Sequence, residues 1–394
     1  MNYEQYLNPG VMAVPPSGIR RFFDMASTMK DTISLGVGEP DFITPYSIRN
    51  AAVNSILDGE TQYTPNRGLL SLRKEISYYM KERYELEYDP GKEILVTIGA
   101  SEAIDLALRA LVCPGDEVLV PQPSYVSYSP SVCFAGGTPV ELETRATDEF
   151  RLKAADVAAA ITPRTKALIL PYPNNPTGGI MEKEDLEELA KVIREKEILV
   201  ISDEIYAELT YGGKKHISFG TMPGMRPYTL TINGFSKAFA MTGWRVGYIC
   251  GPAPLLDQMN KIHQYGIMCA SRQGQAAATE ALRVGREHDY EDVIMMRESY
   301  DKRRRLMVKS FRDMGLDCFE PYGAFYVFPS VECVGMDSET FCRKLLEEKK
   351  IACVPGSAFG KGGEGHIRCC YATALDKLNT ALERMAEFVD QYRV

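Results

Sequence analysis

The sequence predicts an α/β protein in which helices flank a mainly parallel sheet, followed by a smaller α+β region. Short apolar runs alternate with amphipathic stretches as far as about residue 290. Several of these runs are continuously apolar, which is typical of strands buried on both faces. Beyond that point the chain changes to long charged helices and short strands, so a second, smaller unit is expected there.

The strands of the main sheet are predicted from six apolar runs, and the helices between them from the spacing of apolar side chains. The runs are residues 94–98, 117–121, 166–170, 198–202, 228–232 and 246–250. Stretches 101–112 and 182–196 repeat apolar residues every three or four positions, as the buried face of a helix does. This change of period predicts strand–helix units and hence parallel strands.

The C-terminal part is predicted from a long charged helix and the shorter elements after it. These are a helix at 289–313, a strand at 324–328, a helix at 338–350, strands at 351–355 and 366–372, and a helix at 374–392. The proline-containing, loop-rich start of the chain is expected to wrap onto this part or onto a partner subunit. The predicted division is an N-terminal arm with part of the small domain at 1–45, a large domain at 46–288 and a small domain at 289–394.

Composition argues against several classes of partner. The 394 residues carry a formal net charge of −8, and an acidic surface repels nucleic acid and anionic membranes. The ten cysteines form no C-x-x-C pair, so we expect reduced thiols and no metal site. The N-terminal residues lack a secretion-signal pattern, and no apolar run reaches membrane-spanning length. A cytoplasmic location is therefore expected.

Residues 233–245, NGFSKAFAMTGWR, are the first segment with the side chains of a reactive site. They follow the strand predicted at 228–232, and ligands in open α/β sheets bind at the carboxyl ends of strands. Lys237 lies there among small and apolar neighbours, and a desolvated lysine is a usable nucleophile toward an aldehyde. Arg245 is near enough in the sequence to reach the same site. The alternative interpretation is an ordinary solvated loop lysine.

Two further strand ends carry polar side chains that such a site needs. The segment ISDEIY at 201–206 presents Tyr206 and Asp203, whose carboxylate is suited to keeping a ring nitrogen protonated. The segment PYPNNPTGG at 171–179 presents Asn175 on a turn that prolines and glycines fix. Taken singly, a capping aspartate and a turn asparagine are the simpler interpretations.

Two other segments are suited to binding anions. The segment TIGASEAI passes from a strand through Gly99, Ala100 and Ser101 into a helix. Free backbone N–H groups at a helix N-terminus bind phosphate, although a plain strand–helix turn has the same pattern. Arg368 lies inside the apolar strand HIRCCYAT, and a buried arginine needs an anionic partner. An internal Asp or Glu is the simpler expectation, and a substrate carboxylate is the alternative.

Together these motifs resemble the class I/II, aspartate-aminotransferase-like family of fold-type I pyridoxal-phosphate enzymes. The motifs follow one another in the family's order over almost the whole chain: LGVGEPDF (35–42), YTPNRG (63–68), GASEAI (99–104), PQPSYVSY (121–128), NNPTG (174–178), SDEIY (202–206), NGFSKAFAMTGWR (233–245), GAFYVF (323–328) and HIRCCYAT (366–373). The resemblance implies a seven-stranded sheet and a homodimer with a shared active site. It also implies pyridoxal 5′-phosphate as cofactor and amino-group transfer between an L-amino acid and a 2-oxo acid such as 2-oxoglutarate.

The resemblance assigns roles around the cofactor ring. Lys237 is implied to bind the cofactor aldehyde covalently and to move the substrate proton. Asp203 is implied to pair with the pyridine nitrogen and keep it protonated, so that the ring accepts electrons. Tyr206 and Asn175 are implied to hydrogen-bond the 3-oxygen of the ring, and Tyr125 to stack on its face.

The resemblance also assigns residues to the cofactor phosphate and to the substrate α-carboxylate. The residues implied to hold the cofactor phosphate are Gly99, Ala100, Ser101, Ser236 and Arg245. Tyr63 is implied to reach the phosphate in the neighbouring subunit, which makes the active unit a two-fold dimer. Arg368 is implied to bind the substrate α-carboxylate with the backbone of Gly38 nearby.

This sequence departs from the family pattern in two places. Gly234 stands three residues before the lysine, where family members often have a serine. Some members that favour dicarboxylic substrates have a lysine in the turn where this chain has Ser101 and Glu102. Aromatic, aliphatic or a broad range of substrates are therefore expected over strict aspartate. The side chains expected to tolerate them are Tyr125, Tyr128, Val14 and Ile19.

Two other functions fit the same residues. A β-eliminating lyase that breaks C–S bonds has the same cofactor and fold, and its reaction begins with the same loss of the α-proton. A catalytically inactive regulatory homologue would keep the fold without the chemistry. The presence of Lys237, Asp203 and Arg368 argues against that second alternative.

Overall fold

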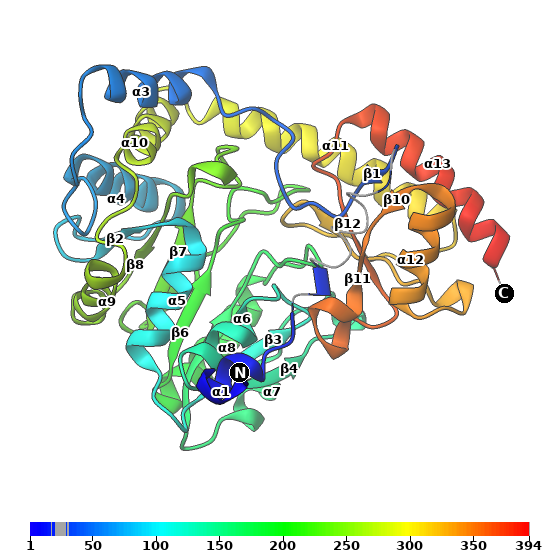
Figure 1. Ribbon diagram of the computed structural model, residues 1–394, viewed down its shortest axis with the longest axis horizontal. Helices are drawn as coiled ribbons and strands as arrows, with labels where there is room; N and C mark the ends of the chain where they lie inside the picture. Colours follow the sequence, from blue (N-terminus) through cyan, green and yellow to red (C-terminus); the bar gives the residue numbers. More distant parts are fainter. Residues whose placement is uncertain (17, 20–28, 30, 394) are drawn as a thin grey trace.

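The computed structural model, which describes residues 1–16, 18–19, 29 and 31–393, is built around a seven-stranded sheet (Figure 1). Its order is β2-β8-β7-β6-β5-β3-β4. The strands are β2 (Ile94–Thr97), β3 (Glu117–Gln122), β4 (Thr138–Glu143), β5 (Thr165–Leu170), β6 (Leu199–Asp203), β7 (Thr229–Gly234) and β8 (Gly247–Cys250). β8 runs antiparallel to both of its neighbours and every other pair is parallel, so the predicted mainly parallel sheet is confirmed.

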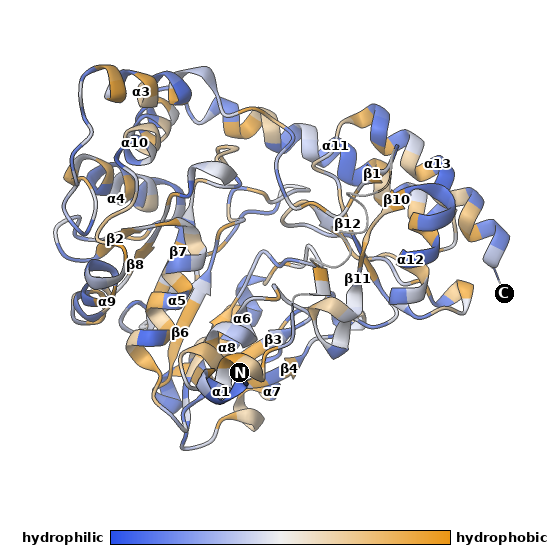
Figure 2. Cartoon of the chain, in the orientation of Figure 1, coloured by the Kyte–Doolittle hydropathy of each residue, from blue (hydrophilic) through white to orange (hydrophobic). Residues whose placement is uncertain are grey.

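The six predicted strands correspond to β2, β3, β5, β6, β7 and β8, whereas β4 was not predicted. β4 lies at the edge of the sheet, and only Leu142 among its residues is buried. An edge strand therefore lacks the continuous apolar run from which the others were identified. The fully buried strands show that run in Figure 2 as orange ribbon along β2, β8 and β6.

Helices cover both faces of this sheet, and the alternation of side chains along each strand decides which face a residue meets. In β6, Ile201 packs into the cluster that contains α5 and α9, whereas Val200 packs into the cluster that contains α8. The helices of this part are α3 (Tyr46–Leu57), α4 (Leu70–Tyr84), α5 (Gly99–Leu111), α6 (Tyr128–Phe134), α7 (Ala154–Ala160), α8 (Lys183–Lys196), α9 (Ala253–Gly266) and α10 (Arg272–Glu287). Within the described residues, no helix has the length and apolarity needed to cross a membrane.

The C-terminal part packs three helices against short strands, and its core continues into the main part of the chain through Tyr206, Leu209 and Tyr211. It contains α11 (Glu291–Asp313), α12 (Ser338–Lys349), α13 (Leu375–Tyr392), β9 (Tyr326–Val327), β10 (Ile351–Ala352), β11 (Val354–Pro355) and β12 (Ile367–Cys370). The run predicted as one strand at 351–355 divides at Cys353. β11 then joins the sheet β11-β12-β9, while β10 pairs with β1 (Ile33–Ser34).

The pairing of β1 with β10 attaches the N-terminal segment to the C-terminal part, far from it in sequence. A short helix, α1 (Pro9–Met12), lies near the start of the chain. Residues 17, 20–28 and 30 of the predicted arm lie outside the described residues. The boundaries at 45/46 and 288/289 remain predictions. Short 3-10 helices complete the chain: η1 (Glu4–Tyr6), η2 (Ala146–Asp148), η3 (Phe219–Thr221), η4 (Arg226–Tyr228), η5 (Thr242–Trp244), η6 (Glu332–Val334), η7 (Gly356–Phe359) and η8 (Lys361–Gly363).

Candidate active site

The carboxyl ends of the central strands open into a cavity of about 1020 Å³ between the main sheet and the C-terminal part. Parallel strands end at the same edge of a sheet, which is why segments far apart in sequence meet there. All of the predicted site residues except Gly99 and Tyr63 line this cavity. They are Gly38, Ala100, Ser101, Tyr125, Asn175, Asp203, Tyr206, Ser236, Lys237, Arg245 and Arg368.

The amine of Lys237 points into the cavity and not into bulk water. Its Nζ donates a hydrogen bond to the carbonyl oxygen of Gly38 at 2.7 Å. It also lies 5.5 and 5.7 Å from the ring centroids of Phe325 and Tyr206. Burial, with the positive charge of Arg368 adding to it, lowers the pKa of Lys237 to about 8. A larger fraction of this lysine is therefore neutral near pH 7 than of an exposed lysine.

The carboxylate of Asp203 is buried at the end of β6 and held by two donors. The hydroxyl of Tyr128 donates to Oδ2 at 2.8 Å, and the backbone N–H of Ile205 donates to Oδ1 at 3.2 Å. Burial raises the pKa of Asp203 to about 6, and the bond from Tyr128 opposes this rise. Sequence reasoning missed this role of Tyr128. Its position three residues after Tyr125, with which it makes an edge-to-face contact, was the available signal.

Arg368 is buried in β12 without a counter-ion. Its Nη1 donates to Oδ1 of Asn175 at 2.9 Å, and its Nη2 donates to the carbonyl oxygen of Gly36. Among the described residues no carboxylate pairs with this guanidinium, and its buried Nε has no hydrogen-bond partner. The expectation of an internal Asp or Glu partner is therefore not met in the described part of the chain. A buried cation in this condition is suited to an anion that enters the cavity.

Tyr206 and Tyr326 form a pair of hydroxyl groups beside Lys237. Their oxygens lie 2.9 Å apart, and both residues are buried. Tyr326 belongs to the motif GAFYVF, but sequence reasoning gave it no role. It also explains why residue 38 is a glycine, because a Cβ on Gly38 would lie 2.2 Å from the Tyr326 hydroxyl.

The start of α5 forms a cradle of small residues beside Arg245. Gly99 has a φ of +70°, and a Cβ on it would lie 2.5 Å from Nη2 of Arg245. Gly99 thus packs against Arg245 and does not line the cavity, whereas Ala100 and Ser101 do line it. A Cβ on Gly234 would lie 2.9 Å from the Cα of Gly247, so the chain has no room there for a side chain without a backbone shift.

Glu102, which stands beside the position of the lysine in some relatives, is turned away from the cavity. Its Oε1 lies 2.6 Å from Nδ1 of His263 on α9, and its Oε2 accepts the backbone N–H of Ile98. Its charge is therefore engaged in fixing the first turn of α5. Ser101 faces the cavity and presents only a hydroxyl there.

Tyr63 lies outside the cavity of its own chain. Its side chain is 77% exposed, and the loop that carries it is held by a 2.8 Å bond from Asn66 to the carbonyl oxygen of Met268. The nearby segment exposes three more apolar side chains, Tyr265, Ile267 and Met268. The structure thus does not bring Tyr63 to the other predicted residues within one chain.

Comparison with known families identifies the chain. The family model described as "Aminotransferase class I and II" matches residues 30–385. The chain belongs to the class I and II aminotransferase family. It is 50% identical to a putative aminotransferase, YugH, of Bacillus subtilis, over 98% of both chains. It is 45% identical to an aspartate aminotransferase of Pyrococcus abyssi, over 97% of both.

Solved structures agree with this assignment. The crystal structure of an aromatic aminotransferase from Pyrococcus horikoshii superposes on this aminotransferase with a TM-score of 0.89 and 44% identity. The match covers 94% of this chain and 99% of the other. The predicted fold class and the predicted transaminase activity are both confirmed.

Proposed function

We propose that this aminotransferase carries pyridoxal 5′-phosphate on Lys237 and transfers amino groups between L-amino acids and 2-oxo acids. The observation that carries the proposal is the convergence of Lys237, Asp203 and Arg368 on one cavity. This chemistry requires three groups. They are an amine of lowered pKa, a buried carboxylate, and a guanidinium that no carboxylate of the described residues pairs with.

The residues present fit the cofactor. Gly99 and Ala100 keep the start of α5 free of bulky side chains, and Arg245 and Ser236 lie on the same side of the cavity. This combination of helix N-terminus, hydroxyl and guanidinium suits a phosphate. Tyr125 lines the cavity and is half-buried, which suits a ring that stacks against a planar aromatic group.

When bound, the cofactor supplies an aldehyde for the amine and a protonated ring that accepts electrons from the substrate α-carbon. Asp203 holds the proton on the ring nitrogen through the oxygen atoms that Tyr128 and Ile205 orient. Arg368 fixes the α-carboxylate, and this orientation decides which bond of the substrate stands over the ring. The Nζ of Lys237 takes the proton from the α-carbon and later returns one, acting first as a base and then as an acid.

The substrate range is proposed to be broad, with aromatic and aliphatic side chains preferred over strict aspartate. The relative from Pyrococcus horikoshii is named an aromatic aminotransferase and that from Pyrococcus abyssi an aspartate aminotransferase. In this chain Val14 and Ile19 line the cavity, and Ser101 supplies no charge there. An apolar wall favours apolar side chains, while glutamate enters as the usual amino donor.

The active unit is proposed to be a homodimer in which Tyr63 completes the site of the partner subunit. An exposed fraction of 77% for a tyrosine, next to exposed Tyr265 and Met268, is unusual for a surface that stays in water. Light scattering of the purified protein should give a dimer. Tyr63→Phe should weaken cofactor binding without changing the mass of the particle.

The deciding experiment reconstitutes the apo-protein with pyridoxal phosphate and screens amino donors against 2-oxoglutarate. Formation of glutamate together with cofactor absorbance that Lys237→Ala lacks supports the proposal. Failure of the wild type to bind the cofactor would overturn it. Assaying pyruvate and ammonia in the same samples tests the competing C–S lyase activity, which the proposal expects to be minor.

The location and domain boundaries are further proposals. A cytoplasmic location is supported by the ten cysteines, all of which are free, because reduced thiols are typical of a reducing compartment. The division into 1–45, 46–288 and 289–394 is supported by the hydrophobic cluster around α11, α12 and α13, most of whose residues lie after residue 289. Limited proteolysis that cuts first near residues 45 and 288 would support these boundaries.

A further inference from the structure

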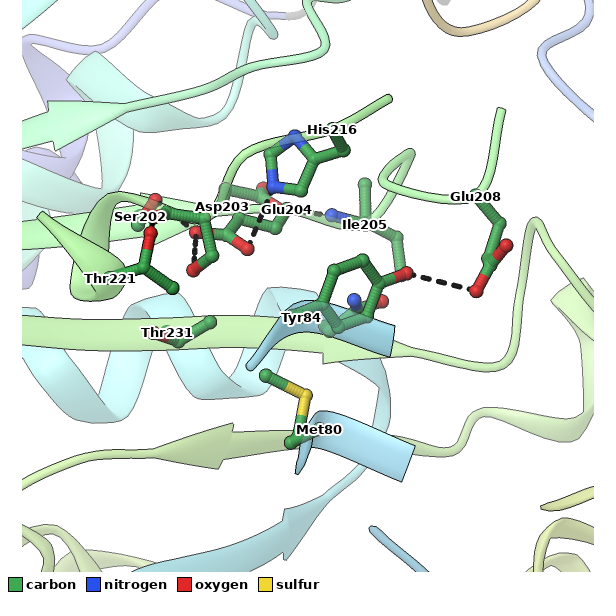
Figure 3. A network of polar contacts seen from close by, with 12 residues as sticks. Met80, Tyr84, Ser202, Asp203, Glu204, Ile205, Glu208, His216, Thr221 and Thr231 are labelled. Atoms are coloured by element: carbon green, nitrogen blue, oxygen red, sulfur yellow. Dashed lines mark hydrogen bonds and ion pairs between the residues drawn. The ribbon is translucent and has the colours of Figure 1, made fainter. Parts of the chain in front are cut away.

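Glu204 is a fully buried carboxylate beside Asp203 for which the proposed chemistry has no use. Its side chain is 0% exposed. Its Oε1 accepts hydrogen bonds from the hydroxyls of Ser202 and Ser218, both at 2.8 Å, and its Oε2 lies 2.8 Å from Nε2 of His216 (Figure 3). Removing a carboxylate from water is costly even when donors surround it, so its presence here calls for a physical account.

Glu204 directly follows the last residue of β6, and its hydrogen bond with Ser202 places it on the opposite face of the sheet from Asp203. Asp203 continues the side of Ile201 and lines the active-site cavity. Ser202 continues the side of Val200, and it lines a separate small cavity together with His216. Glu204 therefore touches neither the cavity nor anything bound in it, and any effect on the reaction has to act through Asp203.

We propose that Glu204 is a positioning residue that keeps a fixed negative charge behind Asp203 and thereby strengthens the grip of Asp203 on the proton of the cofactor ring nitrogen. The inference rests on the proposed function, because it concerns the residue assigned to that ring. A neighbouring like charge disfavours the ionised form of a carboxyl group and raises its affinity for a proton. Ser202, Ser218 and His216 hold the charge in place.

The surroundings of the two carboxylates agree with this role. Burial is the main cause that raises the pKa of Asp203, the charge of Glu204 adds to it, and Tyr128 and Lys237 oppose it. Glu204 thus acts in the same direction as burial and in the direction opposite to Tyr128. The other titratable groups packed near Glu204 are His216 from the loop after β6, Tyr88 before β2 and Cys250 on β8.

The test observes Asp203 in the apo-protein, so that it does not depend on cofactor chemistry. The chain is labelled with 13C at the aspartate carboxyl carbon, and Asp203→Asn identifies the resonance. In the wild type we expect a titration midpoint near pH 6. Glu204→Gln keeps the size of the side chain and removes its charge. It should lower the midpoint by about one pH unit, the effect of one charge at neighbouring-residue distance in an effective dielectric constant of about 20.

Glu208→Gln is the matched control. Glu208 is also a buried glutamate of the same segment, and its carboxylate accepts hydrogen bonds from Arg83, Tyr79 and Tyr84 at 2.6 to 3.1 Å. Figure 3 shows the bond from Tyr84. The control should leave the Asp203 midpoint unchanged within about 0.2 pH units, since it lies farther along the chain and outside the Glu204 cluster. If Glu204→Gln lowers the melting temperature but leaves the midpoint unchanged, Glu204 is only a structural anchor and the inference is overturned.

Two additions keep the test decisive. If Glu204→Gln does not fold, Glu204→Met removes the same charge without adding a buried amide, and the same shift is expected. In the reconstituted enzyme, 15N NMR of ring-labelled pyridoxal phosphate should show the ring nitrogen losing its proton at lower pH in the Glu204 variant. A wild type that binds no pyridoxal phosphate would refute the proposed function, whereas a bound cofactor with unchanged Asp203 and ring-nitrogen titrations would refute only the role of Glu204.

Discussion

The floor and the roof of the cavity treat their charged groups differently. On the floor, formed by the strand ends of the main sheet, both carboxylate oxygens of Asp203 accept a hydrogen bond. On the roof, formed by β12, β9 and the backbone at Gly36–Gly38, the buried Nε of Arg368 has no hydrogen-bond partner, and no carboxylate of the described residues pairs with this guanidinium. A charge that is satisfied in advance suits a resident group, whereas an unsatisfied one suits an anion that comes and goes.

Replacing the floor nucleophile should have the largest effect. Lys237→Ala removes both the attachment of the cofactor and the group that moves the α-proton. We expect kcat/KM for amino-group transfer to 2-oxoglutarate to fall by at least about 1000-fold. Circular dichroism should show an unchanged fold, and residual activity within tenfold of the wild type would contradict the assignment.

Replacing Arg368 on the roof of the cavity should weaken substrate binding and leave cofactor binding nearly unchanged. Arg368→Met removes a charge-assisted pair with the α-carboxylate, so KM for amino acids should rise about 100-fold, equivalent to about 3 kcal/mol. The Kd of pyridoxal phosphate should change less than threefold. Arg245→Met is the matched control with the reverse pattern, because this guanidinium lies against Gly99 at the start of α5. Equal effects of the two variants on cofactor and substrate would remove the distinction between floor and roof.

Removing one hydrogen bond from the floor of the cavity should have a moderate effect on kcat. Tyr128→Phe keeps the ring and removes the hydroxyl that donates to Asp203 at 2.8 Å. Losing a donor to the ionised form should raise the pKa of Asp203 further above about 6. Because the same bond orients Oδ2 of the carboxylate, kcat should fall about tenfold. Comparing kcat and the pH profile with those of Tyr125→Phe separates this effect from a change in stacking. An unchanged acidic limb in Tyr128→Phe would argue against it.

The pH dependence of cofactor capture should show the smallest effect. The pKa of Lys237 is lowered from its usual value to about 8, so the reactive neutral amine is fully present above that pH and lost as the pH falls below it. The rate at which the apo-protein captures pyridoxal phosphate should therefore rise between about pH 7 and pH 9 and then level off. Stopped-flow absorbance measures this rate, and a midpoint above pH 10 would show that the lysine is solvated.

The sequence by itself determined the fold class and most of the site. Continuous apolar runs marked the six buried strands, and motifs in a fixed order supplied Lys237, Asp203, Asn175 and Arg368. Both signals are local in the chain, because burial on two faces requires apolar residues and a strand end requires a turn. The edge strand β4 was not predicted, because a half-exposed strand carries no continuous apolar run.

Only the tertiary structure decided which hydrogen-bond and charge partners these residues have. The bond between Tyr128 and Asp203 joins residues 75 positions apart, and that between Arg368 and Asn175 joins residues 193 apart. Whether Arg368 meets an internal carboxylate, and whether Glu204 faces the cavity or lies behind it, depends on how strands and loops pack in three dimensions. Side-chain partners at such separations are set by the packing of the whole sheet, and no local pattern of residues encodes them.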